Sequence, residues 1–164
     1  MAILDIITIP DSLLKQVSFP VNDITEDICE LAENMRLTML AHKGCVGIAA
    51  VQVGFLTRII IVDVSLSEKS HRSSGTLIMI NPQITYSSGK ISSREGCLSV
   101  PDFIGNVMRK KKIEVDYMDL DGQKRHLKTD GYEAVCIQHE IDHLDGKVFL
   151  DRVTSLKTDI FRRQ

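Results

Sequence analysis

Two stretches of the chain place apolar residues at the three- and four-residue spacing of a helix with one buried face. In the first stretch, the apolar positions are Ile28, Leu31, Ala32, Met35 and Met39. Asp23 and Thr25 are candidate N-caps, so we expect a helix that ends near His42. In the second stretch, residues 133–144, the apolar positions are Ala134, Val135, Ile137, Ile141 and Leu144. Gly146 follows at a place typical of a helix end.

Other stretches favour β-strands. Residues 58–64 form a β-branched run of the kind that is buried on both faces of a sheet. Residues 77–80 and 84–86 predict two further strands, separated by a turn at Asn81 and Pro82.

A β-hairpin is predicted around the Asp-Gly pair at residues 121–122. Ile113, Val115 and Tyr117 alternate with charged residues before this pair, and Leu127 lies beyond it. Alternation with a period of two indicates strands with one buried face, joined here by a turn.

The order of these elements predicts the fold class. Residues 66–76 are polar and predict a surface loop, residues 148–150 a short strand, and residues 155–163 a short helix. Because helices and strands do not alternate as βαβ units, we expect an α+β fold. In this fold, antiparallel or mixed sheets pack around the central helix at 133–144, with an N-terminal helix and a short C-terminal helix. The length of 164 residues suits a single domain over residues 1–164.

Composition and charge exclude several classes of function. Hydrophobic residues make up 43% of the chain and charged residues 26%, which is typical of a globular domain. The formal net charge of −2 provides no basic field that would attract nucleic acid. The longest apolar run, residues 59–62, is too short to cross a membrane, and no signal-peptide pattern is present. We therefore expect a cytoplasmic monomer with reduced cysteines and no nucleic-acid or membrane partner.

The segment HEIDH at residues 139–143 carries the strongest chemical signal. His139 and His143 are four residues apart, so they share one helix face and can bind one metal ion. Glu140 can then reach a water molecule on that ion. The alternative is a pair of solvent-exposed histidines on an amphipathic helix. Ile137 adds apolar surface beside the pair, which favours the metal site.

A catalytic metal site usually has three protein ligands and one open position. The chain beyond His143 contains no further histidine or glutamate, so the third ligand is expected upstream. The best candidate is Cys97, which follows a glycine and can present a thiolate on a loop. The alternatives for Cys97 are a small buried apolar residue and a nucleophile. No base is uniquely assigned to a nucleophile once both histidines bind metal.

Three segments, in this order, resemble the motifs of the peptide deformylase family. Residues 45–52, CVGIAAVQ, are similar to the family's GxGxAAxQ segment. Residues 95–99, EGCLS, match the second motif in full, and residues 138–143, QHEIDH, match QHExDH. Weaker similarity extends from residues 9–11 to residues 144–146.

This resemblance implies a reaction and a cofactor. Family members remove the formyl group from the N-terminal formyl-methionine of nascent polypeptides and release formate. Their single divalent metal is natively Fe(II), and Zn(II), Ni(II) or Co(II) can replace it. The resemblance assigns the ligands to Cys97, His139 and His143, the set that the residue types also suggest. Metal-activated water attacks the formyl carbon, and Glu140 takes the water proton and delivers it to the departing amine.

The resemblance also implies roles for residues outside the metal site. The side-chain amide of Gln52 and the backbone N–H of Leu98 would stabilise the oxyanion of the intermediate. An extended substrate would pair with the backbone near Gly47, and its methionine side chain would enter an apolar pocket. The matching substrate-binding positions are Val46, Gly47, Glu95, Gly96, Tyr132, Val135 and Cys136.

Several positions depart from the family pattern, and two of them bear most directly on the site. Cys45 replaces the first glycine of the first motif, and it would be strained if that position had a positive φ, unless Gly44 carries the turn. Ile104 lies where many bacterial members have an arginine that meets the substrate backbone, so the preference beyond methionine is left open. Some relatives dock on the ribosome with a long terminal helix. Because the tail is short here, ribosome association is also left open.

Two other functions are compatible with parts of this pattern. A zincin-like metallopeptidase also uses HExxH, but the chain lacks the downstream third ligand that such enzymes often have. The other alternative is a catalytically silent metal-binding module, and the presence of both Glu140 and Gln52 argues against it.

Overall fold

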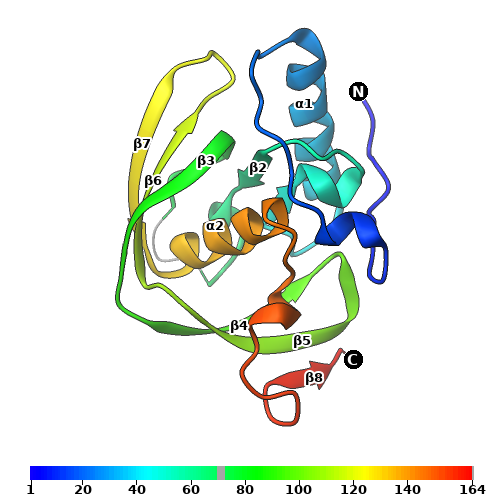
Figure 1. Cartoon of the computed structure of the whole chain (residues 1–164), viewed down its shortest axis with the longest axis vertical. Helices are drawn as coiled ribbons and strands as arrows, with labels where there is room; N and C mark the ends of the chain where they lie inside the picture. Colours follow the sequence, from blue (N-terminus) through cyan, green and yellow to red (C-terminus); the bar gives the residue numbers. More distant parts are fainter. Residues whose placement is uncertain (70–72, 164) are drawn as a thin grey trace.

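The computed structural model of the chain describes residues 1–69 and 73–163. Within these residues, the two α-helices are α1 (Glu26–Ala41) and α2 (Gly131–Leu144). The strands are β1 (Gly47–Ala49), β2 (Ile59–Val62), β3 (Leu77–Ser88), β4 (Ile91–Cys97), β5 (Val100–Arg109), β6 (Lys112–Met118), β7 (Lys124–Asp130) and β8 (Ile160–Arg162). They form one sheet in the order β1-β2-β3-β6-β7 and a second in the order β4-β5-β8, with antiparallel neighbours in both (Figure 1).

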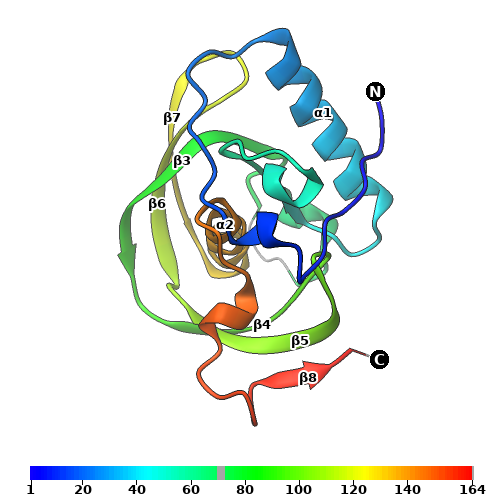
Figure 2. The same ribbon diagram turned by 45° about the vertical axis from the view of Figure 1, so that its right-hand side comes forward.

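Helix α2 lies in the middle of the molecule. Eleven of its fourteen residues are buried. Figure 2 looks almost along its axis and shows β3 and β6 on one side of it and β4 and β5 below it. A helix that is buried on nearly all sides must satisfy its polar side chains internally. This position confirms the predicted α+β class with a central helix.

Strand β2 is buried on both faces, as its sequence predicts. Ile60 packs in the same apolar cluster as Ile137 of α2. Ile61, on the opposite face, packs in a second cluster with Met35 of α1. The five-stranded sheet therefore has one helix on each side.

Helix α1 begins and ends close to the predicted positions. The side-chain oxygen of Thr25 accepts a hydrogen bond from the N–H of Ile28 at 3.3 Å, which is N-capping. Gly44 has a φ of +84° after the helix, whereas Cys45 does not have a positive φ. The glycine therefore carries the turn and the cysteine is not strained there.

The prediction of a C-terminal helix at residues 155–163 is wrong. Ile160–Arg162 instead forms strand β8, which pairs with β5 through Phe103↔Arg162 and Gly105↔Ile160. The backbone groups along the edge of β5 need hydrogen-bond partners, and the end of the chain supplies them. This long-range pairing overrides the local helical pattern.

The predicted strand at 148–150 is also wrong. Phe149–Arg152 forms a 3₁₀ helix, η4. The carboxylate of Asp151 accepts a hydrogen bond from the N–H of Val148 at 2.9 Å. This local bond stabilises a turn in preference to an extended conformation.

The predicted break at Asn81 and Pro82 does not divide the strand. Strand β3 continues through it with a register shift between Ile80 and Gln83. Asn81 has a φ of 53°, and its side chain exchanges two 2.8 Å hydrogen bonds with the backbone of Val21. A proline is accommodated in a strand at such a bulge.

The hairpin predicted around residues 121–122 is confirmed by the pairing of β6 with β7. Residues 70–72 of the loop predicted at 66–76 lie outside the described residues. Among the described residues, no helix combines the length and the apolar character that a membrane span needs.

Candidate active site

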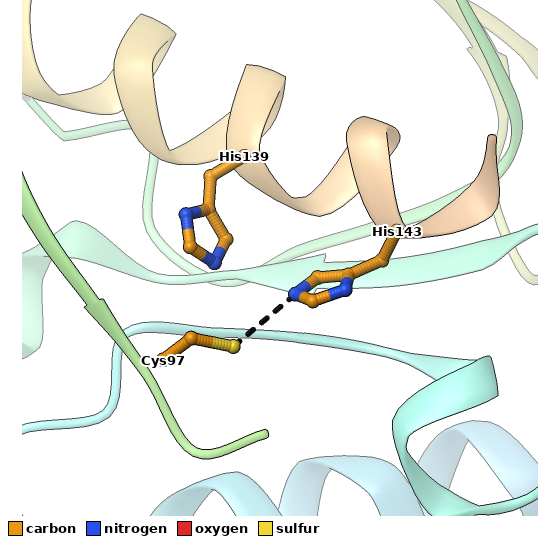
Figure 3. A group of neighbouring side chains, drawn as sticks. All are labelled: Cys97, His139 and His143. Carbon is orange, nitrogen blue, oxygen red and sulfur yellow. Dashed lines mark hydrogen bonds between the residues drawn. The ribbon is translucent and has the colours of Figure 1, made fainter. Parts of the chain in front are cut away.

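Cys97, His139 and His143 converge from two elements. Cys97 is the last residue of β4, and both histidines project from α2 toward it (Figure 3). One donor atom from each residue lies within 4.8 Å of the others. The Sγ atom of Cys97 is 3.3 Å from Nε2 of His143. The four-residue spacing on the helix and the tight turn between β4 and β5 together produce this convergence.

The surroundings of Cys97 favour the thiolate. Burial alone would raise the pKa of this thiol, but the imidazoles of His143 and His139 outweigh burial and hold the pKa well below its usual value. A thiolate and two imidazoles are a ligand set that suits Fe(II), Zn(II) or Co(II). The three residues therefore fit a divalent metal ion by donor type and by position.

A buried ion network fixes the orientation of His139. Its Nδ1 atom is 2.8 Å from Oε1 of Glu95, so its other ring nitrogen, Nε2, faces Cys97. The guanidinium of Arg109 donates to both oxygens of Glu95, at 2.9 and 2.7 Å, and to Asp142 at 2.6 Å. Arg152 donates to the same aspartate. This carboxylate–histidine contact is typical of the support behind a metal ligand.

The network changes the titration of Glu95. Burial alone would raise its pKa, but hydrogen bonds from Arg109 and His139 lower the pKa to about 2. Glu95 is therefore a carboxylate, and both of its oxygens are already paired with protein groups. Its carboxylate lies behind His139, and Glu95 also lines the cavity, so its predicted contact with the substrate stays a prediction.

Glu140 lies beside the three donors in a buried position. Its Oε1 atom is 3.9 Å from Nε2 of His143 and has no hydrogen-bond partner among the described residues. Burial raises its pKa to about 7. A carboxylate with such a pKa can accept and release a proton near neutral pH.

The side chain of Gln52, in the 3₁₀ helix η2 (Ala50–Val53), points toward Cys97. Its Oε1 accepts a hydrogen bond from the N–H of Ala49 at 2.9 Å. Its Nε2 donates to Sγ of Cys97 at 3.3 Å and to Oγ of Ser99 at 3.1 Å. The amide is thus oriented with its donor side toward the cysteine. Ser99 lies within the EGCLS segment, but we did not predict this contact.

A cavity of about 380 Å³ joins these groups. Its lining includes all the predicted substrate-binding positions: Val46, Gly47, Glu95, Gly96, Tyr132, Val135 and Cys136. It also includes Gln52, Leu98, Cys97, His139 and Glu140, whereas His143 is fully buried. The predicted site residues therefore gather at one place in the fold.

Five polar residues that line the cavity were not predicted from the sequence. They are Lys43, Lys69, Ser93, Arg94 and Arg163. Basic residues are scattered over most chains, and no local pattern distinguishes these from solvated surface residues. Arg162 and Arg163 are adjacent in the sequence, but only the pairing of β8 with β5 brings Arg163 to the cavity.

These features together are typical of the active site of a hydrolase. The site has a buried glutamate whose pKa is raised, an oriented amide and three donors that fit a metal ion. All of these residues except His143 line one cavity.

Comparison with known proteins specifies the family. The polypeptide deformylase family model matches residues 3–159, and the chain belongs to this family. A peptide deformylase of Syntrophobacter fumaroxidans is 41% identical over 164 residues, covering 100% of this chain and 94% of the relative. The crystal structure of peptide deformylase from Ehrlichia chaffeensis is similar with a TM-score of 0.87 at 38% identity, covering 94% of this chain and 90% of that chain.

A second Ehrlichia chaffeensis crystal structure, of peptide deformylase in complex with actinonin, has a TM-score of 0.87 at 38% identity and covers 96% of this chain and 92% of that chain. Membership in this family favours a deformylase over the zincin-like metallopeptidase that the HExxH pattern alone left open.

Proposed function

We propose that the chain removes the formyl group from the N-terminal formyl-methionine of nascent polypeptides in a metal-dependent hydrolysis that releases formate. The observation that carries this proposal is the convergence of Cys97, His139 and His143 beside the buried carboxylate of Glu140. Family membership supports the substrate class.

Cys97, His139 and His143 would hold one divalent metal ion. When bound, such an ion acts as a Lewis acid that polarises a carbonyl oxygen and lowers the pKa of water. We propose Fe(II) as the native metal, in line with the family resemblance. Because this donor set does not select one metal by geometry, Zn(II), Ni(II) or Co(II) can substitute for it.

Glu140 is the proposed acid/base. Its Oε1 atom is buried and accepts no hydrogen bond from the described residues, so it remains available to a water molecule in the cavity. It takes a proton from the attacking water and returns it to the amine of methionine as the C–N bond breaks. The raised pKa of its carboxyl group, about 7, suits both steps.

Gln52 and Leu98 are the proposed donors to the oxyanion. The Nε2 group of Gln52 already points to the cysteine side of the cavity, and Leu98 is the next residue after Cys97. Donors that are fixed before the reaction stabilise the developing negative charge without reorganising.

Changing Gln52 to glutamate is expected to lower kcat about 100-fold, which is typical for the loss of one oxyanion donor. The substitution keeps the shape of the side chain and the acceptor for the N–H of Ala49, but it removes the donor. Steady-state formate release measures the effect. Ser99→Ala is the matched control, because it removes only a contact that positions the amide, and its effect should be smaller. An unchanged kcat in Gln52→Glu would exclude this role.

The backbone of Gly47 is the proposed docking edge for the substrate. Strand β1 is the edge strand of its sheet. The N–H of Asp63 donates to the carbonyl of Val46 at 2.8 Å, so the backbone groups of Gly47 point away from β2. The thiol of Cys45 donates to the carbonyl of Gly47 at 3.2 Å. An extended peptide can add to this free edge as a further strand.

The pocket for the methionine side chain is proposed at Val46, Tyr132, Val135 and Cys136. All four line the cavity, and Val135 and Cys136 are buried residues of α2. Their side chains therefore contribute to packing as well as to the pocket.

Changing Gly47 to alanine is expected to lower kcat roughly 10- to 100-fold, since a displacement of about 1 Å can cost 10²-fold in rate. A Cβ atom at this position would lie 2.9 Å from Oε2 and 3.0 Å from Cδ of Glu140. The carboxylate must therefore move. Gly47 does not have a positive φ, so alanine adds no backbone strain. The melting temperature and metal content should stay near wild type, and a wild-type kcat would contradict the proposed packing.

We further propose that residues 1–164 work as a single catalytic domain in the cytosol, where a thiolate ligand stays reduced. We also propose that the chain acts as a monomer.

The test of this function is formate release from formyl-Met-Ala-Ser by anaerobically purified protein whose metal content is measured. We expect formate in proportion to bound metal and no cleavage of the Met-Ala bond. A metal-loaded protein that releases no formate would overturn the proposal and would favour a catalytically silent metal-binding module.

A further inference from the structure

The rim of the cavity is positively charged. Four of its exposed lining residues are basic: Lys43, Lys69, Arg94 and Arg163. The carboxylates in the lining are Glu95 and Glu140, and both are buried. Among the described lining residues, the exposed charged side chains are therefore all basic, although the whole chain has a net charge of −2.

Arg163 reaches this rim from the terminal strand. Its backbone N–H donates to the carbonyl of Asp102 at 2.8 Å, next to the pairing of β8 with β5. A Cβ atom built on Gly96 would lie 2.5 Å from Nη2 of Arg163 and 3.2 Å from Cγ2 of Ile104. The guanidinium therefore covers Gly96, immediately before Cys97. Arg163 forms no ion pair with the residues that the structure describes.

Arg94 is oriented by the same terminal segment. Its guanidinium carbon lies 4.5 Å from the centroid of the Phe161 ring, which is a cation–π contact. Its Nε donates to Oδ1 of Asn106 at 3.3 Å. Neither of its Nη groups has a hydrogen-bond partner among the described residues, so both remain for a ligand.

We propose that Arg163 and Arg94 form a subsite for a carboxylate that the peptide substrate carries after its formyl-methionine. This inference rests on the proposed function. In this binding mode, the formyl group of the peptide lies at the buried end of the cavity, beside Cys97 and Glu140. The residues that follow methionine therefore extend outward along the rim of the cavity. Gly96 adjoins Cys97, which puts the guanidinium of Arg163 beside the first residues after methionine. An acidic side chain or a free terminal carboxylate supplies the same charged group.

The experiment compares four peptides in low and high salt. They are formyl-Met-Ala-Ser-amide, formyl-Met-Ala-Ser with a free carboxylate, formyl-Met-Glu-Ser-amide and formyl-Met-Gln-Ser-amide. For the wild type we expect kcat/KM to be about fivefold higher with a carboxylate than with the matching neutral peptide, near the upper limit for an exposed ion pair. The difference should lie mainly in KM and should shrink in high salt. The second and third peptides identify which source of carboxylate the subsite prefers.

The variant Arg163→Ala is expected to lower this ratio, because only Arg94 of the subsite remains, and Arg163→Glu is expected to lower it further. Arg163→Lys should retain part of it. Arg162→Ala is the matched control, because Arg162 is the adjacent arginine and is not in the cavity lining, and it should keep the wild-type ratio. Each ratio is internal to one protein, so a partly misfolded variant does not distort it.

A wild-type ratio of one, or a ratio that Arg163→Ala leaves unchanged, would overturn the subsite while formate release still upheld the proposed function. No formate from any of the four peptides would overturn both.

Discussion

Replacing Glu140 with glutamine is expected to lower kcat for formate release about 1000-fold, within the range for loss of a general acid/base. The carboxylate is buried, and its Oε1 has no hydrogen-bond partner among the described residues, so an amide of the same shape can replace it. The amide cannot accept the proton of water or return it to the amine. Metal content should stay at the wild-type level, because none of the three proposed ligands is changed.

Glu133→Gln is the matched control for this prediction. Glu133 is a second buried glutamate of α2, and its carboxylate accepts hydrogen bonds from Ser74 and Thr129. It does not line the cavity, so kcat should remain close to the wild-type value. A Glu140→Gln variant that kept both its metal and its kcat would remove Glu140 from the mechanism.

Replacing Arg109 with methionine is expected to lower the free energy of unfolding by about 3–5 kcal/mol, the typical cost of removing one partner of a buried ion pair. Glu95 and Asp142 both pair with this guanidinium, at 2.7 and 2.6 Å. Without it, Glu95 loses its cation while its burial remains. Urea unfolding followed by circular dichroism measures the change.

Arg125→Met serves as the control for Arg109→Met. Arg125 forms an exposed ion pair with Asp119 at 2.8 Å, and its loss should cost less than about 1 kcal/mol. Similar costs for the two variants would show that the buried network contributes little to stability.

The same network predicts a dependence of stability on pH. The pKa of Glu95 falls from an ordinary value of 4.5 to about 2 in the folded chain. A depressed pKa in the folded state stabilises it above the unfolded pKa, and this contribution is lost as the pH falls from about 4.5 to about 2. In Arg109→Met, the pKa of Glu95 should rise. The ionised carboxylate of Glu95 should then contribute less to the free energy of unfolding at neutral pH.

The central helix, strand β2 and the two histidine donors could be predicted because their signals are local. Histidines four residues apart share a face of any helix, and four consecutive apolar β-branched residues are buried wherever the strand forms. Cys97 was selected by the lack of a downstream ligand, by its glycine neighbour and by the resemblance of residues 95–99 to a family motif. Its contact with His143 depends on the β4–β5 turn, which the sequence does not reveal.

The terminal strand could not be predicted in the same way. Residues 155–163 have a local pattern compatible with a helix, and their conformation is decided by the free edge of β5. The position of Arg163 at the cavity therefore could not be predicted from the sequence. From the sequence, Arg109 is a candidate partner of either Glu95 or Asp142, and no local pattern chooses between them because the three residues come from different elements. The structure shows both ion pairs.

X-ray absorption spectroscopy of the zinc-loaded protein tests most directly whether Cys97, His139 and His143 bind one ion. We predict one sulfur ligand at about 2.3 Å and two imidazole nitrogens at about 2.0–2.1 Å, with the sulfur lost in Cys97→Ser. A spectrum without sulfur, or one whose sulfur persists in Cys97→Ser, would contradict the metal site on which the proposed reaction depends.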